Sequence, residues 1–204
     1  MKRIWKVALL MSTGFLLASC SWIYELGKSE NDNLEFDASQ ANMYVKEFEY
    51  VNQNNETVQL TDLKGNYWLA DMVFTSCPTV CPIMTPNMKE LHDTAINEKL
   101  NMKFVSFTVD PENDTVDHLK RYTENIGVND DYWYFLTGYD LEEITRFAEE
   151  SFLSPVQKVE DDFIHSTRFF LINEDGQIVR MYNGMENDLT EVKEDMVATV
   201  KEAE

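Results

Sequence analysis

Segments with the pattern of buried strands alternate with segments with the pattern of helices along most of this 204-residue chain. Three short, mostly apolar runs, at 67–74, 103–109 and 133–136, are typical of strands that are covered on both faces. Helical patterns follow each run, and Asp114 and Asp140 are expected to cap two of these helices. Because a helix between two strands of one sheet makes a crossover connection, the alternation predicts parallel strand pairs and an α/β fold.

Two predicted hairpins bracket the alternating segments. The first joins 48–52 to 56–60, and the second joins 166–172 to 177–182 through a turn that contains a glycine. A last helix is predicted over 189–201. We therefore predict a mixed sheet with helices on both faces. Sites in such sheets lie beyond the carboxyl ends of the parallel strands.

The first residues have the pattern of an export signal. A basic start precedes an apolar run, 7–18, that is shorter than the span of about 20 residues needed to cross a bilayer. The run ends in Leu-Ala-Ser-Cys, which resembles the lipobox at which bacterial lipoproteins are cleaved and lipidated. We expect a lipoprotein signal peptide over 1–19, a lipidated Cys20 that begins a polar tether over 20–40, and a folded domain over 41–204. The alternative is an ordinary signal peptide with a coincidental cysteine.

This N-terminus predicts a protein held by a lipid anchor at the extracytoplasmic face of the cell membrane. The formal net charge of the chain is −20, and it becomes −23 when cleavage removes three basic residues and no acid. Such an acidic surface repels phosphate backbones, so nucleic acids are disfavoured as partners.

Two cysteines remain for chemistry if Cys20 carries lipid. Cys77 and Cys81 each precede a proline, and a residue in that position is pushed away from the helical backbone conformation. Pro82 suits the first turn of a helix. The pair is therefore expected in a loop at a helix N-terminus, where the helix dipole and free N–H groups favour both thiolates. Such a pair is a redox couple, a metal site or a local disulfide bridge.

Copper fits this dithiol better than zinc. A structural zinc site uses four ligands, usually as two pairs, and the sequence offers no second pair. Thiolates bind Cu(I) well, and imidazole suits Cu(II). Among the three histidines, His92 and His118 are expected on the solvated faces of helices. His165 differs because it lies at the start of a strand, where both a structural role and a ligand role are open.

Four short elements carry a resemblance to a known family. They are Cys-Pro-Thr-Val-Cys-Pro at 77–82, Val-Asp-Pro-Glu at 109–112, Phe-Leu-Thr-Gly at 135–138, and His165 before the strand at 169–172. In order and spacing these elements resemble the Sco/SenC family, and the similarity covers nearly the whole exported part of the chain.

The resemblance implies a thioredoxin-like fold and a copper site formed by Cys77, Cys81 and His165. It also implies a role in building the dinuclear copper A centre of cytochrome c oxidase, with the oxidase subunit that carries this centre as the partner. His165 would stand where ordinary thioredoxins place a cis-proline, which weighs against a general disulfide reductase. Asp110 matches the family aspartate near the metal loop, where it either affects the ligands from outside the coordination sphere or serves as a turn residue.

Asp71 interrupts an apolar strand run. A buried carboxyl needs a partner or takes a raised pKa, and Asp71 could then transfer protons to the thiols. At a strand edge it would be satisfied without such a role. Met84 and Met88 fit helix packing better than copper transfer.

We interpret the chain as a copper-binding metallochaperone or redox factor and not as an enzyme with turnover. The alternative is a membrane-anchored thiol–disulfide oxidoreductase that reduces the cysteines of the oxidase subunit before copper arrives. Both functions use the same dithiol.

Overall fold

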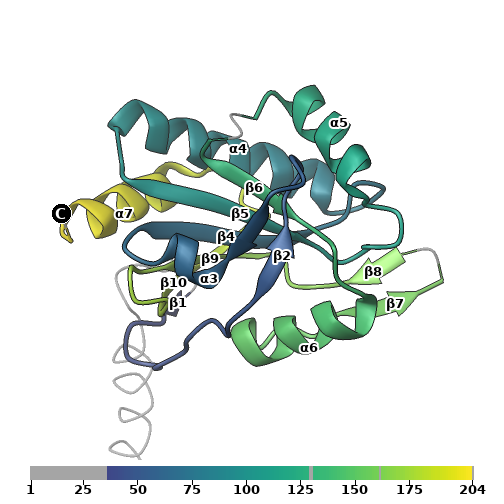
Figure 1. The fold of residues 1–204 in the computed structure, drawn as a ribbon. Coiled ribbons are helices and arrows are strands. Elements are labelled where there is room, and N and C mark those ends of the chain that lie inside the picture. Colours follow the sequence, from purple (N-terminus) through teal and green to yellow (C-terminus); the bar gives the residue numbers. More distant parts are fainter. Residues whose placement is uncertain (1–35, 129–130, 161, 204) are drawn as a thin grey trace, which may run out of the picture. The chain divides into compact units, whose positions relative to one another are not determined.

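A six-stranded sheet with the order β1-β10-β9-β4-β5-β6 forms the centre of the computed structural model, which describes residues 36–128, 131–160 and 162–203 (Figure 1). β4 pairs with β5 and β5 with β6 in parallel, whereas the other neighbours are antiparallel. The predicted mixed sheet is therefore confirmed. Its strands are β1 (Phe36–Asp37), β4 (Tyr67–Val73), β5 (Met102–Thr108), β6 (Trp133–Leu136), β9 (Arg168–Ile172) and β10 (Ile178–Asn183).

The sheet begins at Phe36, ahead of the domain boundary predicted at residue 41. The predicted signal peptide, Cys20 and the tether as far as residue 35 lie outside the described residues. No helix of the described part of the chain has the length and apolar character needed to span a membrane.

Helices cover both faces of the sheet, as predicted. The ring of His92 in α4 packs against Phe104 of β5, with 5.2 Å between centroids, whereas Phe147 of α6 packs against Phe107 at 5.0 Å. Because side chains alternate along a strand, Phe104 and Phe107 point to opposite faces. The helices are α3 (Leu60–Leu63), α4 (Cys81–Glu98), α5 (Val116–Ile126), α6 (Leu141–Phe152) and α7 (Thr190–Lys201).

Side-chain caps set the first residues of α5 and α6. Asp140 accepts a hydrogen bond from the N–H of Glu143 at 2.8 Å, which confirms it as the cap of α6. The prediction for α5 is wrong by one residue, because Thr115 accepts from the N–H of His118 and is the cap. Asp114 is instead buried at the end of β5.

Three hairpins complete the fold, and two of them were predicted. β2 (Glu49–Val51) pairs with β3 (Thr57–Gln59), and β9 pairs with β10. The third joins β7 (Gln157–Val159) to β8 (Asp162–Ile164) and was not predicted. It ends directly before His165.

The Phe-Leu-Thr-Gly element has a packing role. Thr137 makes a β-bridge to Val51, which places the first hairpin against the end of β6. Gly138 has a φ of +89°, and a Cβ atom at this position would lie 2.6 Å from a methyl carbon of Val51. Glycine is therefore required by both the backbone conformation and the close contact.

Candidate metal centre

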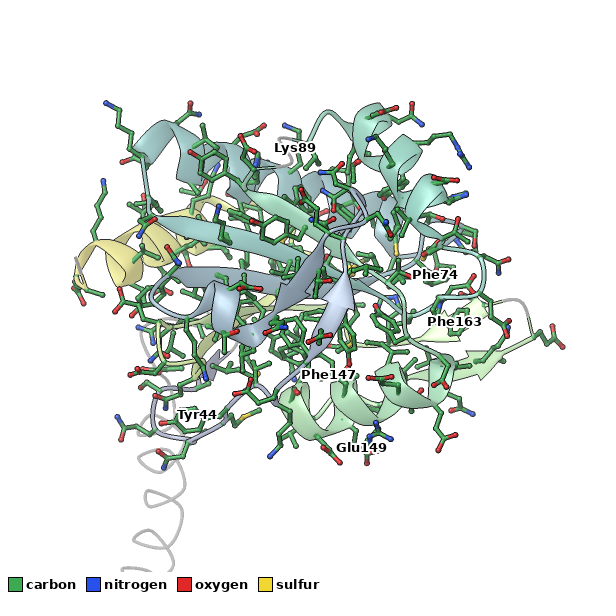
Figure 2. All side chains as sticks on the ribbon, viewed as in Figure 1. Tyr44, Phe74, Lys89, Phe147, Glu149 and Phe163 are labelled. Atoms are coloured by element: carbon green, nitrogen blue, oxygen red, sulfur yellow. The ribbon has the colours of Figure 1, made fainter. Side chains whose placement is uncertain are left out.

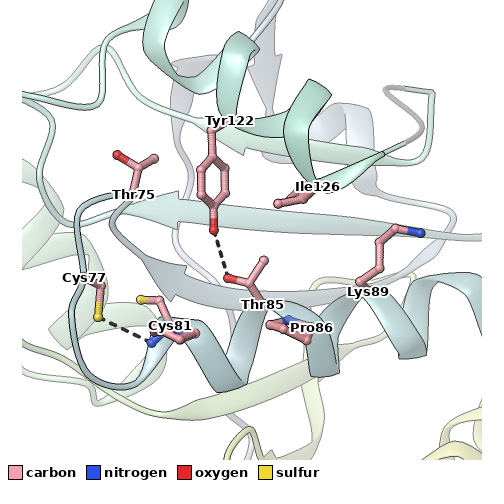
Figure 3. A pocket seen from close by; sticks show the side chains of 9 residues that line it. Thr75, Cys77, Cys81, Thr85, Pro86, Lys89, Tyr122 and Ile126 are labelled. Carbon is pink, nitrogen blue, oxygen red and sulfur yellow. Dashed lines mark hydrogen bonds between the residues drawn. The ribbon is translucent and has the colours of Figure 1, made fainter.

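The cysteine loop connects the carboxyl end of β4 to the first turn of α4 (Figure 3). The N–H of Cys77 donates to the carbonyl of Phe74 at 3.2 Å, and the N–H of Cys81 donates to the Sγ atom of Cys77 at 3.4 Å. Pro82 lies in the first helical turn, where a missing N–H has no cost. The predicted position of the pair at a helix N-terminus is confirmed, and both thiols are free and buried.

The pKa values of the two thiols are shifted in opposite directions. Burial raises the pKa of Cys77, but hydrogen bonds from Cys81 and Thr79 outweigh this effect and lower the pKa below its usual value. Burial raises the pKa of Cys81 far above the usual range of a thiol, and the neighbouring Cys77 and Asp71 add to the increase. The expectation of two stabilised thiolates is therefore wrong for Cys81, because this thiol lies deeper than Cys77 and beside negative groups.

His165 lies at the end of the hairpin formed by β7 and β8, and its ring is held as a neutral imidazole. Its Nδ1 atom is 2.8 Å from the carbonyl oxygen of Ser166. A carbonyl only accepts, so Nδ1 carries the hydrogen and Nε2 keeps its lone pair. Burial lowers the pKa of His165, which favours the neutral ring. Nε2 is buried and has no hydrogen-bond partner among the described residues.

Phe74 orients the His165 ring. Its own ring makes edge contacts with His165, at 5.9 Å between centroids, and with Phe163 at 5.3 Å. Figure 2 shows Phe74 and Phe163 side by side where β4 meets the hairpin. The N–H of Ser166 also donates to the Oγ atom of Ser154 at 3.3 Å. The imidazole is therefore positioned by packing on one side and by backbone hydrogen bonds on the other.

The structure brings the three predicted ligands together. The two Sγ atoms and a ring nitrogen of His165 all lie within 4.8 Å of one another. Because Nδ1 is hydrogen-bonded to Ser166, the buried Nε2 atom is the nitrogen that is free to bind a metal ion together with the two sulfur atoms. The same dithiol can also close to a disulfide.

Asp110 lies outside this group of three. Its carboxylate accepts from the side chain of Asn113 at 2.8 Å, and its carbonyl accepts from the N–H groups of Asn113 and Asp114. These bonds form the turn that follows β5. An effect of Asp110 on the metal stays a prediction.

Asp114 holds the beginning of the cysteine loop, and this role was not predicted. Its carboxylate accepts from the N–H of Thr75 at 3.1 Å, from the Thr75 hydroxyl at 2.5 Å, and from the Thr108 hydroxyl at 2.5 Å. His118 is exposed, as expected, but its Nε2 atom is 2.9 Å from Oγ1 of Thr75. Because the Thr75 hydroxyl donates to Asp114, His118 is the donor to Thr75.

Asp71 lies in the interior of the sheet, so the strand-edge alternative is wrong. The side chain is 1% exposed, and one carboxyl oxygen accepts from the Ser106 hydroxyl at 2.6 Å. The other oxygen is buried and has no partner among the described residues. Burial raises the pKa of Asp71 to about 7. Asp71 thus has both a partner and a raised pKa.

His92 is buried, which contradicts the expectation of a solvated face. It is 2% exposed and packs against both Phe104 and Trp133, at 5.2 Å and 5.6 Å between ring centroids. The rotation of α4 on the sheet turns this position inward next to Leu91. Met84 and Met88 are fully buried in the same helix, which confirms their packing role.

The fold and this group of residues define a thioredoxin-like protein with a buried dithiol beside a neutral histidine. The family model described as SCO1/SenC matches residues 36–201. The chain belongs to the SCO1/SenC family.

Three relatives show how far the similarity extends. The SCO1 protein homolog of Bacillus subtilis is 42% identical over 164 residues, which are 79% of this chain and 83% of that protein. The crystal structure of a SCO1/SenC family lipoprotein from Bacillus anthracis is 41% identical, with a TM-score of 0.75 over 80% of this chain and 96% of that chain. The structure of BsSco, described with a disulfide switch and as a member of the Sco family of cytochrome c oxidase assembly proteins, is 41% identical, with a TM-score of 0.72 over 79% and 94%.

Proposed function

We propose that the protein binds one copper ion through Cys77, Cys81 and His165 and serves in assembly of the copper A centre of cytochrome c oxidase. Two observations carry this proposal: a ring nitrogen of His165 lies within 4.8 Å of both sulfur atoms, and the Nε2 atom of this ring is buried without a hydrogen-bond partner among the described residues. Thiolates suit Cu(I), and a neutral imidazole suits Cu(II). With Cu(II) bound, two thiolates and one neutral imidazole also form a site with no net formal charge. A buried position tolerates a neutral site better than a charged one.

The family supports the assembly role. BsSco, at 41% identity, is described as a member of a family of oxidase assembly proteins, and the partner proposed here is the oxidase subunit that carries the copper A site. The Bacillus anthracis relative is described as a lipoprotein. It supports membrane association of this chain, which we propose to occur through lipid on Cys20 at the extracytoplasmic face.

Thiol–disulfide exchange remains the second candidate function, because the two thiols differ in acidity. Hydrogen bonds lower the pKa of Cys77, whereas burial raises that of Cys81. Such a pair can attack a disulfide through Cys77 and then resolve the mixed disulfide through Cys81. The description of BsSco as containing a disulfide switch agrees with this chemistry.

Oxidase activity in cells that carry His165→Ala separates the two functions. Disulfide exchange needs the two thiols and no imidazole, whereas stable Cu(II) binding needs the imidazole. We expect cells with His165→Ala and cells with Cys77→Ala both to lose cytochrome c oxidase activity, and added copper to restore part of it in the His165→Ala cells. Normal oxidase activity in the His165→Ala cells, together with loss of copper binding by the purified variant, would leave only the oxidoreductase function.

A further inference from the structure

A groove runs from the two thiols along the surface between α4 and α5 (Figure 3). Its volume is about 500 Å³. Pro82, Thr85 and Pro86 of α4 line one side, and Tyr122 and Ile126 of α5 line the other. Cys77 and Cys81 line its end, whereas His165 does not contribute to it. A molecule in this groove can therefore reach the sulfur atoms while His165 stays in place.

The lining of the groove is almost without charge on a chain whose net charge is −20. Its one charged group is Lys89, and the ammonium of Lys89 is 2.8 Å from both carboxylate oxygens of Asp93. The prolines and Ile126 present apolar surface. A neutral, apolar occupant fits such a lining better than a charged one, because a charge would lose its hydration there without gaining a partner.

Two hydroxyl groups in the groove together have one hydrogen that is free for donation to a bound molecule. Oγ1 of Thr85 lies 3.1 Å from the hydroxyl oxygen of Tyr122, so one of the two hydrogens is used between them. The other has no acceptor among the described residues. Thr85 and Tyr122 both line the groove, so whichever hydroxyl carries this hydrogen can donate it to a molecule held there. A main-chain carbonyl of an extended polypeptide would accept this hydrogen.

We propose that this groove holds an extended, apolar segment of the partner polypeptide and presents a cysteine of that segment to Cys77. The inference rests on the proposed function, in which the partner receives copper or electrons at its own cysteines. Apolar side chains of the segment contact Pro82, Pro86 and Ile126. A carbonyl of its main chain accepts from the Thr85–Tyr122 pair.

Capture of short peptides by Cys77 tests the proposal. The full-length mature protein carries Cys81→Ser, so that a mixed disulfide on Cys77 is trapped, and mass spectrometry locates the adduct. The probes are the symmetric disulfides of acetyl-Leu-Cys-Leu-amide and acetyl-Gly-Cys-Gly-amide. Cys77 forms a bond to one sulfur of the probe, the probe disulfide breaks, and its other half leaves as a thiolate that takes a proton from water. The two probes share length, charge and thiol and differ in the residues that flank the cysteine, and the groove variants below show how much of their rate ratio comes from contact with the groove.

We expect the leucine probe to react about tenfold faster than the glycine probe, as burial of part of two leucine side chains implies. Ile126→Ala should lower this ratio at least threefold. The matched control is Ile96→Ala, which removes an exposed isoleucine of α4 that does not line the groove and should leave the ratio as it is. The double variant Thr85→Val/Tyr122→Phe removes both hydroxyls and should slow both peptide probes about fivefold relative to the small, non-peptide hydroxyethyl disulfide, the equivalent of one hydrogen bond, whereas Tyr44→Phe should not.

Equal rates for the two probes on the protein with an intact groove overturn the proposal, and so does an equal fall of the ratio in the two alanine variants. If Ile126→Ala does not fold, a competition experiment replaces this variant. It measures whether acetyl-Leu-Ser-Leu-amide, a peptide without a thiol, occupies the groove and protects Cys77. This peptide should slow capture of the glycine probe, and absence of protection counts against the groove. Copper binding is measured in a separate experiment. A protein that does not bind copper but still prefers the leucine probe would refute the proposed copper function and leave the peptide groove supported.

Discussion

Replacing Asp71 with asparagine tests the electrostatics next to the dithiol. Asp71 is fully enclosed in β4, and burial raises its pKa to about 7 although the Ser106 hydroxyl donates to it. In an unfolded chain the pKa of an aspartate is about 4. Because the folded pKa is the higher one, the folded state holds the proton more tightly, and stability is lost as the pH rises from about 4 to about 7.

The size of this effect follows from the two pKa values. At pH 5 the carboxyl of Asp71 is protonated in the folded state and already ionised in the unfolded state. The pH then rises by about two units before it reaches the folded pKa of about 7. Each unit corresponds to about 1.4 kcal/mol, so between pH 5 and pH 8 the wild-type protein loses about 3 kcal/mol of unfolding free energy through Asp71. Asparagine has nearly the same shape and does not ionise. We therefore expect Asp71→Asn to gain about 3 kcal/mol relative to wild type over this pH range.

Urea unfolding of the metal-free, reduced protein at pH 5 and pH 8 measures this difference. Asp117→Asn is the matched control, because Asp117 is an exposed acid in the first turn of α5. Its effect should stay within about 0.5 kcal/mol at both pH values. A gain of less than about 1 kcal/mol by Asp71→Asn would mean that Asp71 ionises close to the usual pKa of an aspartate, and the reasoning from its burial would then fail.

Three further predictions concern the loop, the thiols and the N-terminus. Asp114→Asn should lower the unfolding free energy by about 1–3 kcal/mol, because the amide nitrogen cannot accept from the Thr75 N–H or the Thr108 hydroxyl. A loss no larger than that of Asp117→Asn in urea unfolding would contradict the role of Asp114. In the reduced, metal-free protein at neutral pH, iodoacetamide should modify Cys77 at least about tenfold faster than Cys81, which follows from the directions of their pKa shifts and is read by peptide mass spectrometry. Similar rates would show that the two thiols are equivalent. Cys20→Ser should leave the protein soluble or as an uncleaved precursor, and an unmodified Cys20 inside a mature chain would refute lipidation.

The cysteine loop could be predicted because its causes are local. Two Cys-Pro steps and the preference of proline for a first helical turn were enough to place Cys77 and Cys81 at the start of α4. The strands β4, β5 and β6 were equally accessible, since all three are mostly apolar runs. For His165 the motif resemblance supplied what local pattern did not. The hairpin that carries it consists of two strands of three residues with mostly exposed side chains, and such strands have no clear hydrophobic periodicity.

The errors arose where tertiary contacts decide. Thr115 and Asp114 are both good capping residues, and only the burial of Asp114 against Thr75 and Thr108 assigns the cap to Thr115. Whether His92 faces solvent depends on how α4 is rotated on the sheet, which sequence spacing defines only to within a residue or so. The difference in acidity between the two thiols likewise depends on burial depth and on neighbours from β4.

X-ray absorption at the copper edge tests the central claim most directly, because it identifies the atoms bound to the metal. The mature protein loaded with one equivalent of copper should show two sulfur neighbours and one imidazole nitrogen. In His165→Ala the imidazole contribution should disappear while a Cys77–Cys81 disulfide can still form. Copper in the wild-type protein with no imidazole nitrogen, or with fewer than two sulfur neighbours, would contradict a site built from Cys77, Cys81 and His165.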